Sequence, residues 1–251
     1  MAMSERLPSP EQQQHVIFPV KDYLGGLKKA LPIIIGYFTV AVAFGLLART
    51  SGLSNTESGS MSLIVFAGAS QFAALNLLTG GTAFFEIIIA TFFLNLRHLL
   101  MSASLSLHFK SFPLPAKIFL AFGITDETFA IASTDLNSIT PAGMAGLETG
   151  AYLSWFGGTM AGYYLGTALP PSLQAAMGLA LYALFSALLL PQIKHSLKLA
   201  ALALSAAALN SILVIAVGLP AGWSFVVAML ATSLAGAFTG LEAPKEYNDE
   251  S

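Results

Sequence analysis

The sequence of 251 residues contains no cysteine and few charged side chains. The absence of cysteine excludes disulfide bonds, thiolate metal sites and a cysteine nucleophile within these residues. Only 10% of the residues are Asp, Glu, Lys or Arg, against about 25% in a typical soluble domain. The formal net charge of -2 gives no reason to expect a nucleic-acid partner.

Long hydrophobic runs take the place of the missing charge, and 55% of the residues are hydrophobic. A chain of this composition is expected to be solvated mostly by lipid, as a polytopic membrane protein. Since the runs are of spanning or nearly spanning length with short connections, we expect one all-α bundle of about six to eight membrane spans. The runs occupy residues 30–48, 62–78, 83–107, 116–134, 149–169, 174–191, 197–217 and 222–240.

The polar ends are expected to lie outside a transmembrane permease domain of residues 30–240. In the tail of residues 1–29, apolar and basic side chains between 20 and 29 have the spacing of a short amphipathic helix on the membrane surface. Residues 241–251 form an acidic tail. Because lysine and arginine precede the first span, the N-terminus is predicted to be cytoplasmic.

Two basic loops conflict with eight simple crossings. Lys110 and Lys117 would then lie on the opposite side of the membrane from Lys194 and Lys198. The conflict disappears if two of the first four segments are broken or re-entrant. The second and fourth segments are the best candidates, because non-helical backbone is tolerated at depth where it lines an enclosed cavity.

The third segment carries Glu86, Asn95, Arg97 and His98 inside an apolar run. A charge at the bilayer centre costs about 2.5 to 3.5 kcal/mol on insertion scales, so it usually has a pairing or transport role. Helical geometry puts Asn95 and His98 on one face and points Glu86 and Arg97 the same way, about three turns apart. Arg97 either holds a substrate carboxylate or an acidic partner, or fixes helix register as a structural ion pair. His98 either relays protons or hydrogen-bonds a backbone carbonyl.

The fourth segment carries the adjacent acids Asp126 and Glu127. Neighbouring residues diverge by about 100° around a helix, so both cannot face one partner unless the backbone breaks. We expect one acid to face Arg97 and the other to face a polar cavity, where it can bind and release a proton. The alternative is that both lie at a hydrated helix end.

In the second segment, the small residues at 67–69 are followed by two polar side chains, Ser70 and Gln71, between Phe66 and Phe72. If the helix breaks there, the N-terminus of its second half offers free N–H groups and a positive dipole end to an anion. Close packing by small residues is the alternative.

Two features of the later segments indicate packing. Gly158, Gly162 and Gly166 repeat every four residues in the fifth segment, which predicts a helix-packing face. Asn210 is isolated in the seventh segment and is expected to make an interhelical hydrogen bond.

No catalytic constellation indicates an enzyme. Ser70 and His98 suggest an intramembrane serine protease, but Gln71 stands where such enzymes place a glycine. The four histidines lack metal-ligand spacing, so neither a metal nor another cofactor is expected. A membrane scaffold or ion-channel subunit is the alternative to a transporter, although no ring of like charge indicates a channel.

Several short motifs resemble one family in order along the chain. They are Leu31, Pro32, Gly36, Met61, Ser62, the run 66–72, the run 95–98 and the pair 126–127. From about residue 22 to 240 the chain resembles the AzlC-like large subunit of bacterial branched-chain amino acid exporters. The second half is similar only in hydropathy and length.

The resemblance implies a permease of the bacterial cytoplasmic membrane, powered by the proton gradient, that exports valine, leucine, isoleucine and often methionine. It also implies a small hydrophobic AzlD-like partner subunit. The residues expected to bind substrate are Ser70, Gln71, Asn95 and Arg97. The residues expected to form a charge or proton-coupling network are Glu86, His98, Asp126 and Glu127. The aromatic side chains expected to surround the aliphatic part of the substrate are Phe66, Phe72 and Phe129.

Overall fold

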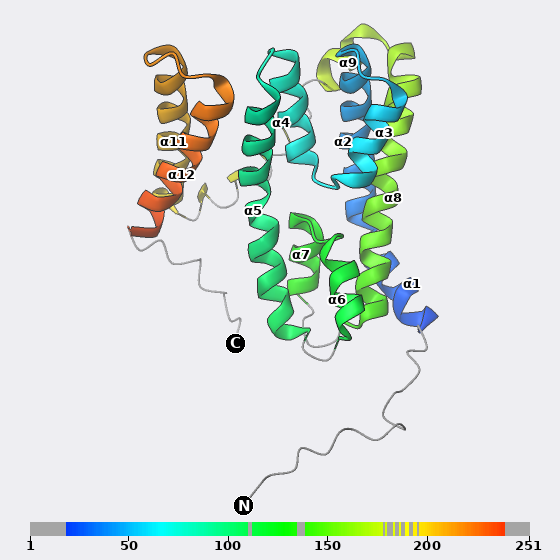
Figure 1. The fold of residues 1–251 in the computed structure, drawn as a ribbon. Helices are drawn as coiled ribbons and strands as arrows, with labels where there is room; N and C mark the ends of the chain where they lie inside the picture. Colours follow the sequence, from blue (N-terminus) through cyan, green and yellow to red (C-terminus); the bar gives the residue numbers. More distant parts are fainter. Residues whose placement is uncertain are drawn as a thin grey trace, which may run out of the picture.

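The computed structural model describes residues 19–109, 112–134, 139–177 and 196–238, with isolated positions between 179 and 194. Within these residues every regular element is a helix, which confirms the all-α class. Figure 1 shows α5 between an α11–α12 hairpin on one side and the α2–α8 pair on the other. Residues 1–18 of the N-terminal tail, the acidic C-terminal tail and half of the sixth hydrophobic segment lie outside the described residues.

The central helix pair is α2 (Leu31–Thr50) and α8 (Pro141–Leu165). The predicted packing row is Gly158, Gly162 and Gly166, and a Cβ on any of the three would come too close to α2. At Gly158 and Gly162 the Cβ would overlap the α2 backbone, which at Gly162 is that of Val42. The missing side chains let the two backbones approach closely, as small residues do between membrane helices. The packing role of this row is confirmed.

The amphipathic stretch forms α1 (Val20–Lys29), which packs against the first turns of α8. A Cβ on Gly26 or Gly146 would overlap the backbone of the facing helix. The hydroxyl of Thr140 also donates to Asp22 Oδ2 at 2.9 Å. The helix is therefore present as expected, with one side held against the bundle.

The second hydrophobic segment is broken into α3 (Asn55–Ile64) and α4 (Gly68–Thr79). Between them Ala67 leaves the helical region, with φ -149° and ψ 86°, and no side chain caps α4. A Cβ at Gly68 would overlap the Trp155 ring of α8, so the break brings the α4 backbone directly against that indole.

The fourth segment is broken into α6 (Leu114–Ala121) and α7 (Asp126–Ser133). Thr125 caps α7: its hydroxyl accepts from Thr128 N at 3.3 Å, and Thr128 Oγ1 accepts from Thr125 N at 2.8 Å. The Thr128 hydroxyl also donates to Gly123 O at 3.0 Å. These bonds satisfy backbone groups that the break would otherwise leave unpaired. Both breaks hypothesised from the sequence are present.

The fifth segment begins eight residues earlier than expected, at Pro141 rather than at 149. Thr140 caps the helix by accepting from Gly143 N at 3.1 Å, and proline is favoured at the first helical position. The hydropathy pattern missed this start because glycines and Glu148 dilute the apolar signal. The correction places Glu148 two turns inside α8.

The remaining described helices are α5 (Phe84–His108), α11 (Leu197–Ile215) and α12 (Ala221–Phe238), with a 3-10 turn η2 (Gly166–Ala168) and a short α9 (Pro171–Met177) after α8. The α11–α12 hairpin contacts α5 through α12. Ser224 Oγ donates to Asn210 Oδ1 at 2.9 Å between the two hairpin helices, which confirms the bond expected of Asn210.

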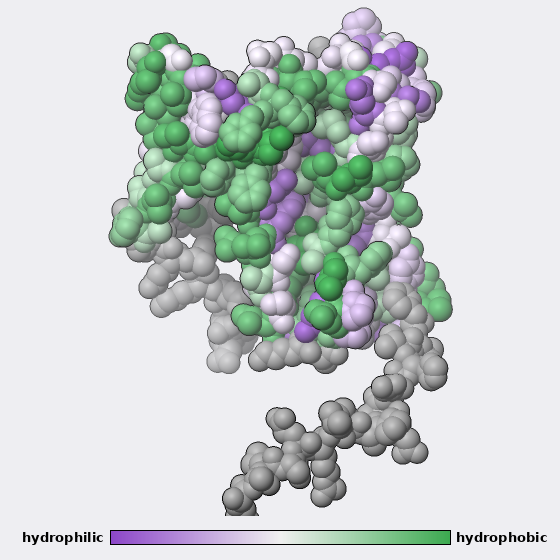
Figure 2. All heavy atoms as spheres, in the orientation of Figure 1, coloured by the Kyte–Doolittle hydropathy of each residue, from purple (hydrophilic) through white to green (hydrophobic). Residues whose placement is uncertain are grey.

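Apolar side chains cover the outer faces of the bundle. Among the described helices, α2, α5 and α11 are long and apolar enough to cross a membrane. Figure 2 shows hydrophobic surface over α5 and the hairpin, with hydrophilic side chains gathered in a seam beside α5. Soluble proteins rarely expose such continuous apolar area, so these faces are in contact with lipid or another membrane protein.

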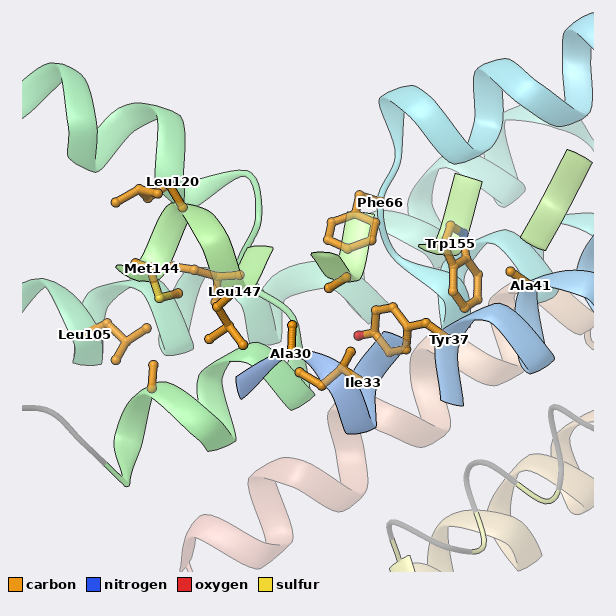
Figure 3. Close-up of a cluster of buried hydrophobic side chains, with 14 of the residues drawn as sticks. Ala30, Ile33, Tyr37, Ala41, Phe66, Leu105, Leu120, Met144, Leu147 and Trp155 are labelled. Carbon is orange, nitrogen blue, oxygen red and sulfur yellow. The ribbon is translucent and has the colours of Figure 1, made fainter. Parts of the chain in front are cut away.

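An aromatic cluster joins the first break to the central pair. Figure 3 shows Tyr37 of α2 between Phe66, from the α3–α4 break, and Trp155 of α8. The Tyr37 ring centroid lies 6.1 Å from that of Phe66 and 5.3 Å from that of Trp155, both edge to face. Such pairs contribute about 0.5 to 1.5 kcal/mol beyond area burial. The cluster thereby fixes the position of the break.

Candidate functional site

The two breaks bring the N-terminal ends of α4 and α7 to one small cavity of about 30 Å³, with α2, α5 and α8 completing its wall. Its lining consists of Tyr37, Ala67, Gly68, Ala69, Arg97, His98, Thr125, Asp126, Glu127 and Trp155. Small-ligand pockets measure roughly 300 to 1,000 Å³. In this conformation the cavity is therefore far smaller than an amino-acid site.

Arg97 of α5 pairs with Asp126, the first residue of α7. Arg97 Nη1 lies 2.9 Å from Asp126 Oδ2, and the two side chains are 33% and 31% exposed. The positive end of the α7 dipole also favours a carboxylate at this position. Arg97 Nε is buried without a hydrogen-bond partner, which leaves one donor for a ligand. The expectation that one acid of the pair faces Arg97 is confirmed.

Glu127 faces α2 instead. The hydroxyl of Tyr37 donates to Glu127 Oε2 and lies 2.7 Å from Thr125 Oγ1. Because Tyr37 is buried, this contact takes place away from bulk water. Adjacent acids on one helix turn therefore have two different partners, as their divergence around the helix requires.

Ser70 and Gln71 are committed to contacts within the bundle. Ser70 Oγ donates to Asn95 Oδ1 of α5. Gln71 Oε1 accepts from Trp155 Nε1 at 2.7 Å, and its Nε2 donates to Ser62 Oγ at 3.2 Å. Ser70 is 1% exposed and Gln71 0%, and neither lines the cavity. At this end of α4, the residues that line the cavity are Ala67, Gly68 and Ala69.

His98 and Glu86 lie at different places on α5. His98 lines the small cavity and also a larger neighbouring pocket. Glu86 lies eleven residues before Arg97, roughly 16 Å along the helix. It packs beside Gly222 of α12, with Oε2 buried and unpaired. Glu86 is therefore not part of the Arg97 cluster. Throughout the described ranges, no three His, Asp or Glu side chains gather as a metal site.

A larger apolar pocket of about 600 Å³ lies between α5, α6 and α8 and meets the small cavity at His98. Its size falls within the roughly 300 to 1,000 Å³ of small-ligand pockets. Phe66 and Phe72 are buried in the core and Phe129 packs against it, and none of them lines either space. The structure therefore brings none of these three aromatic side chains to either space, and their role around the substrate stays a prediction.

Three residues of this region were not expected from the sequence: Tyr37, Trp155 and Glu148. Tyr37 and Trp155 lie in apolar runs, where an aromatic residue is normally assigned to the hydrophobic core. The sequence feature that could have indicated their role is that a buried phenol or indole needs a hydrogen-bond partner. Glu148 was missed because the expected segment began one residue after it.

Comparison with known proteins identifies the family. The AzlC protein family model matches residues 32–169, more than half of the chain. An uncharacterized membrane protein of Archaeoglobus fulgidus is 39% identical over 172 residues, 67% of this chain and 75% of that protein. The inner membrane protein YgaZ of Escherichia coli is 34% identical over 227 residues, 87% of this chain and 89% of its own length.

A third relative is the branched-chain amino acid transport protein AzlC of Bacillus subtilis, 31% identical over 104 residues, 41% of each chain. No solved structure matches the chain. The matched range contains both broken segments, α5 and α8, which together form the site. These similarities support a membrane transport role. The chain therefore belongs to the AzlC family.

Proposed function

We propose that this chain is a secondary transporter that exports branched-chain amino acids across the bacterial cytoplasmic membrane, coupled to the proton gradient. It would work with a small AzlD-like subunit and have its N-terminus in the cytoplasm. The observation that carries the proposal is the Arg97–Asp126 ion pair at the point where two half-helix N-termini meet. The name of the Bacillus subtilis relative supports the substrate class.

The substrate carboxylate would bind between α4 and Arg97. No side chain caps the first turn of α4, so its N–H groups and dipole are available to an anion. Arg97 adds a fixed charge and a free Nε donor on the facing helix.

The substrate ammonium would bind Asp126 or Glu127. A zwitterion that enters the cavity replaces one internal ion pair by two: carboxylate to Arg97 and ammonium to Asp126. The exchange keeps each buried charge partnered, which avoids the penalty of an unpaired ion. The ion pair would thereby hold the empty site closed until a zwitterion takes its place.

The aliphatic side chain would occupy the 600 Å³ apolar pocket. This pocket begins at His98, next to the charged groups, and is lined by apolar residues such as Leu105, Leu120 and Met144. A headgroup at the small cavity would place the side chain of leucine or valine toward this space.

Labelled leucine in proteoliposomes tests the proposal, with and without the small partner. We expect leucine counterflow by the chain with its partner, and a loss of most activity in Arg97→Lys, because lysine lacks the planar fork. Arg49→Lys is the matched control, since Arg49 is exposed and donates only to backbone carbonyls at the end of α8. Normal transport by Arg97→Lys contradicts carboxylate recognition, and no flux of any aliphatic amino acid favours a scaffold.

Thiol labelling tests the α4 end of the site in this cysteine-free chain. Cysteine at Ala69, on the cavity wall, should react with an impermeant reagent from one side when the transporter opens, and leucine should slow the reaction. Cysteine at Ala41, which is buried between helices, is the unreactive control. Labelling of Ala69→Cys that ignores every aliphatic amino acid moves the carboxylate site elsewhere.

A further inference from the structure

Glu148 is a buried acid that the proposed substrate site does not use. It lies on α8 and is 5% exposed, and its Oε1 has no hydrogen-bond partner. The side chain borders a separate pocket of about 260 Å³ between α6 and α8. The rest of the wall consists of Phe119, Phe122, Gly123, Ala145, Thr149, Tyr152 and Leu153.

Among the described residues that line this pocket, Glu148 has no charged neighbour. Tyr152, one turn along α8, is the other titratable side chain on the pocket wall. On α6, Lys117 lines the neighbouring apolar pocket, and on α7, Asp126 and Glu127 line the small cavity. A carboxyl buried without a partner strongly prefers to be neutral, and it ionises only if water or a cation reaches it.

The charged side chains of the other helices that pack on α8 lie away from Glu148. Gly146 and Gly150 face α1 and α2, and each is two residues from Glu148, about 200° around the helix. The charged groups of α1 and α2 on that opposite side are Lys21, Asp22, Lys28, Lys29 and Arg49. Glu57 is exposed at the start of α3, which meets α8 near Phe156, about 12 Å further along.

The two acids expected to couple protons already have partners in the site. Asp126 pairs with Arg97. Glu127 accepts a hydrogen bond from Tyr37 beside the cap of α7. A proton added to either would remove an interaction that holds the site together, whereas Glu148 gives up no partner by being protonated.

Glu148 also touches the break between α6 and α7. A Cβ on Gly123 would overlap the Glu148 carboxyl group, so the α6–α7 break lies directly against this acid. Gly123 O accepts from Thr128, and Asp126 begins the helix that follows. Loss of the proton would therefore place a negative charge directly against the α6–α7 break, and a displacement of the break would carry Asp126 with it.

We propose that Glu148 is the proton-binding carboxyl of the transporter: the bound proton keeps the α6–α7 break closed against α8, and its release opens the break. The opening and closing of the break during transport rest on the proposed transport function. The proton site itself can be tested without transport.

The direct test is modification of the unmutated protein in detergent or lipid with dicyclohexylcarbodiimide, an apolar reagent that adds to protonated carboxyl groups. Peptide mass spectrometry should find the adduct on Glu148 at neutral pH and little on Asp126 or Glu127. Because the protonated fraction of a carboxyl falls about tenfold per pH unit above its pKa, labelling should decline as the pH is raised. Absence of the adduct, or labelling indifferent to pH, overturns the proposal.

The coupled test uses Glu148→Gln, which mimics the protonated acid, with Glu57→Gln as the control at an exposed capping glutamate. We expect Glu148→Gln to support leucine counterflow but to lose leucine movement driven by a pH gradient, while the control keeps both. Full gradient-driven transport by Glu148→Gln overturns the proposal. If the unmutated chain moves no amino acid, the proposed function is wrong, and carbodiimide labelling still decides whether Glu148 binds a proton.

Discussion

Substitution of the fully buried Gln71 tests whether this side chain stabilises the fold or binds substrate. Its carbonyl accepts from Trp155 Nε1 at 2.7 Å and its amide donates to Ser62 Oγ at 3.2 Å. In Gln71→Leu the side chain keeps a similar size, but the indole N–H of the buried Trp155 loses its acceptor. Ser62 keeps a partner, because its hydroxyl also bonds Thr159 at 2.8 Å.

The expected cost is that of one buried donor left unsatisfied, about 1 to 3 kcal/mol. For a chain of this size, a central cost of about 2 kcal/mol lowers the unfolding temperature by about 4 to 8 °C. Tryptophan fluorescence measures it directly, since Trp155 is one of only two tryptophans in the sequence. Gln174→Leu is the matched control, because Gln174 is half-exposed and bonds only backbone carbonyls.

The opposite outcome would refute this reasoning. If Gln71→Leu melts within about 1 °C of the unmutated protein while leucine binding weakens, Gln71 acts on substrate and its bond to Trp155 contributes little.

The remaining predictions concern the acidic pair and the helix interface. Asp126→Asn should abolish leucine counterflow, because Arg97 loses its counter-charge. Glu127→Gln should fold and show a raised apparent KM for leucine, since its amide oxygen still accepts from the Tyr37 hydroxyl. Equal behaviour of the two variants in proteoliposomes contradicts their separate roles. Gly162→Leu should lower the stability of the protein by about 1 to 3 kcal/mol or more, because the new side chain overlaps α2. The measurement is the yield and the unfolding temperature in detergent. Gly157→Leu is the control and should be nearly neutral, since its side chain points into open space on the same helix. A stable Gly162→Leu protein would mean that α2 and α8 can separate at little cost.

Local chemistry in the sequence was enough for much of the outline. Hydrophobic composition and run length predicted a helical membrane bundle, because lipid forces the backbone to satisfy its own hydrogen bonds. Small and polar residues at 66–71 and 123–127 predicted both helix breaks, and the four-residue glycine spacing predicted a packing face on the fifth segment. These features depend on residues close together in the chain.

Boundaries and partners required the tertiary structure. Hydropathy alone placed the start of the fifth segment after Glu148 and could not choose which acid meets Arg97. The bonds Tyr37–Glu127 and Trp155–Gln71 join residues 90 and 84 positions apart. No local pattern encodes such pairs.

The sequence by itself determined the class of the molecule, the polar residues placed in its apolar runs and the points where two helices break. The tertiary structure alone decided that Asp126 binds Arg97, that Gln71 is enclosed and that Glu148 Oε1 is buried without a hydrogen-bond partner among the described residues. The physical reason is that the rotation and approach of packed helices are set by side chains of several helices at once. Each of these contacts depends on that joint packing and not on its own segment.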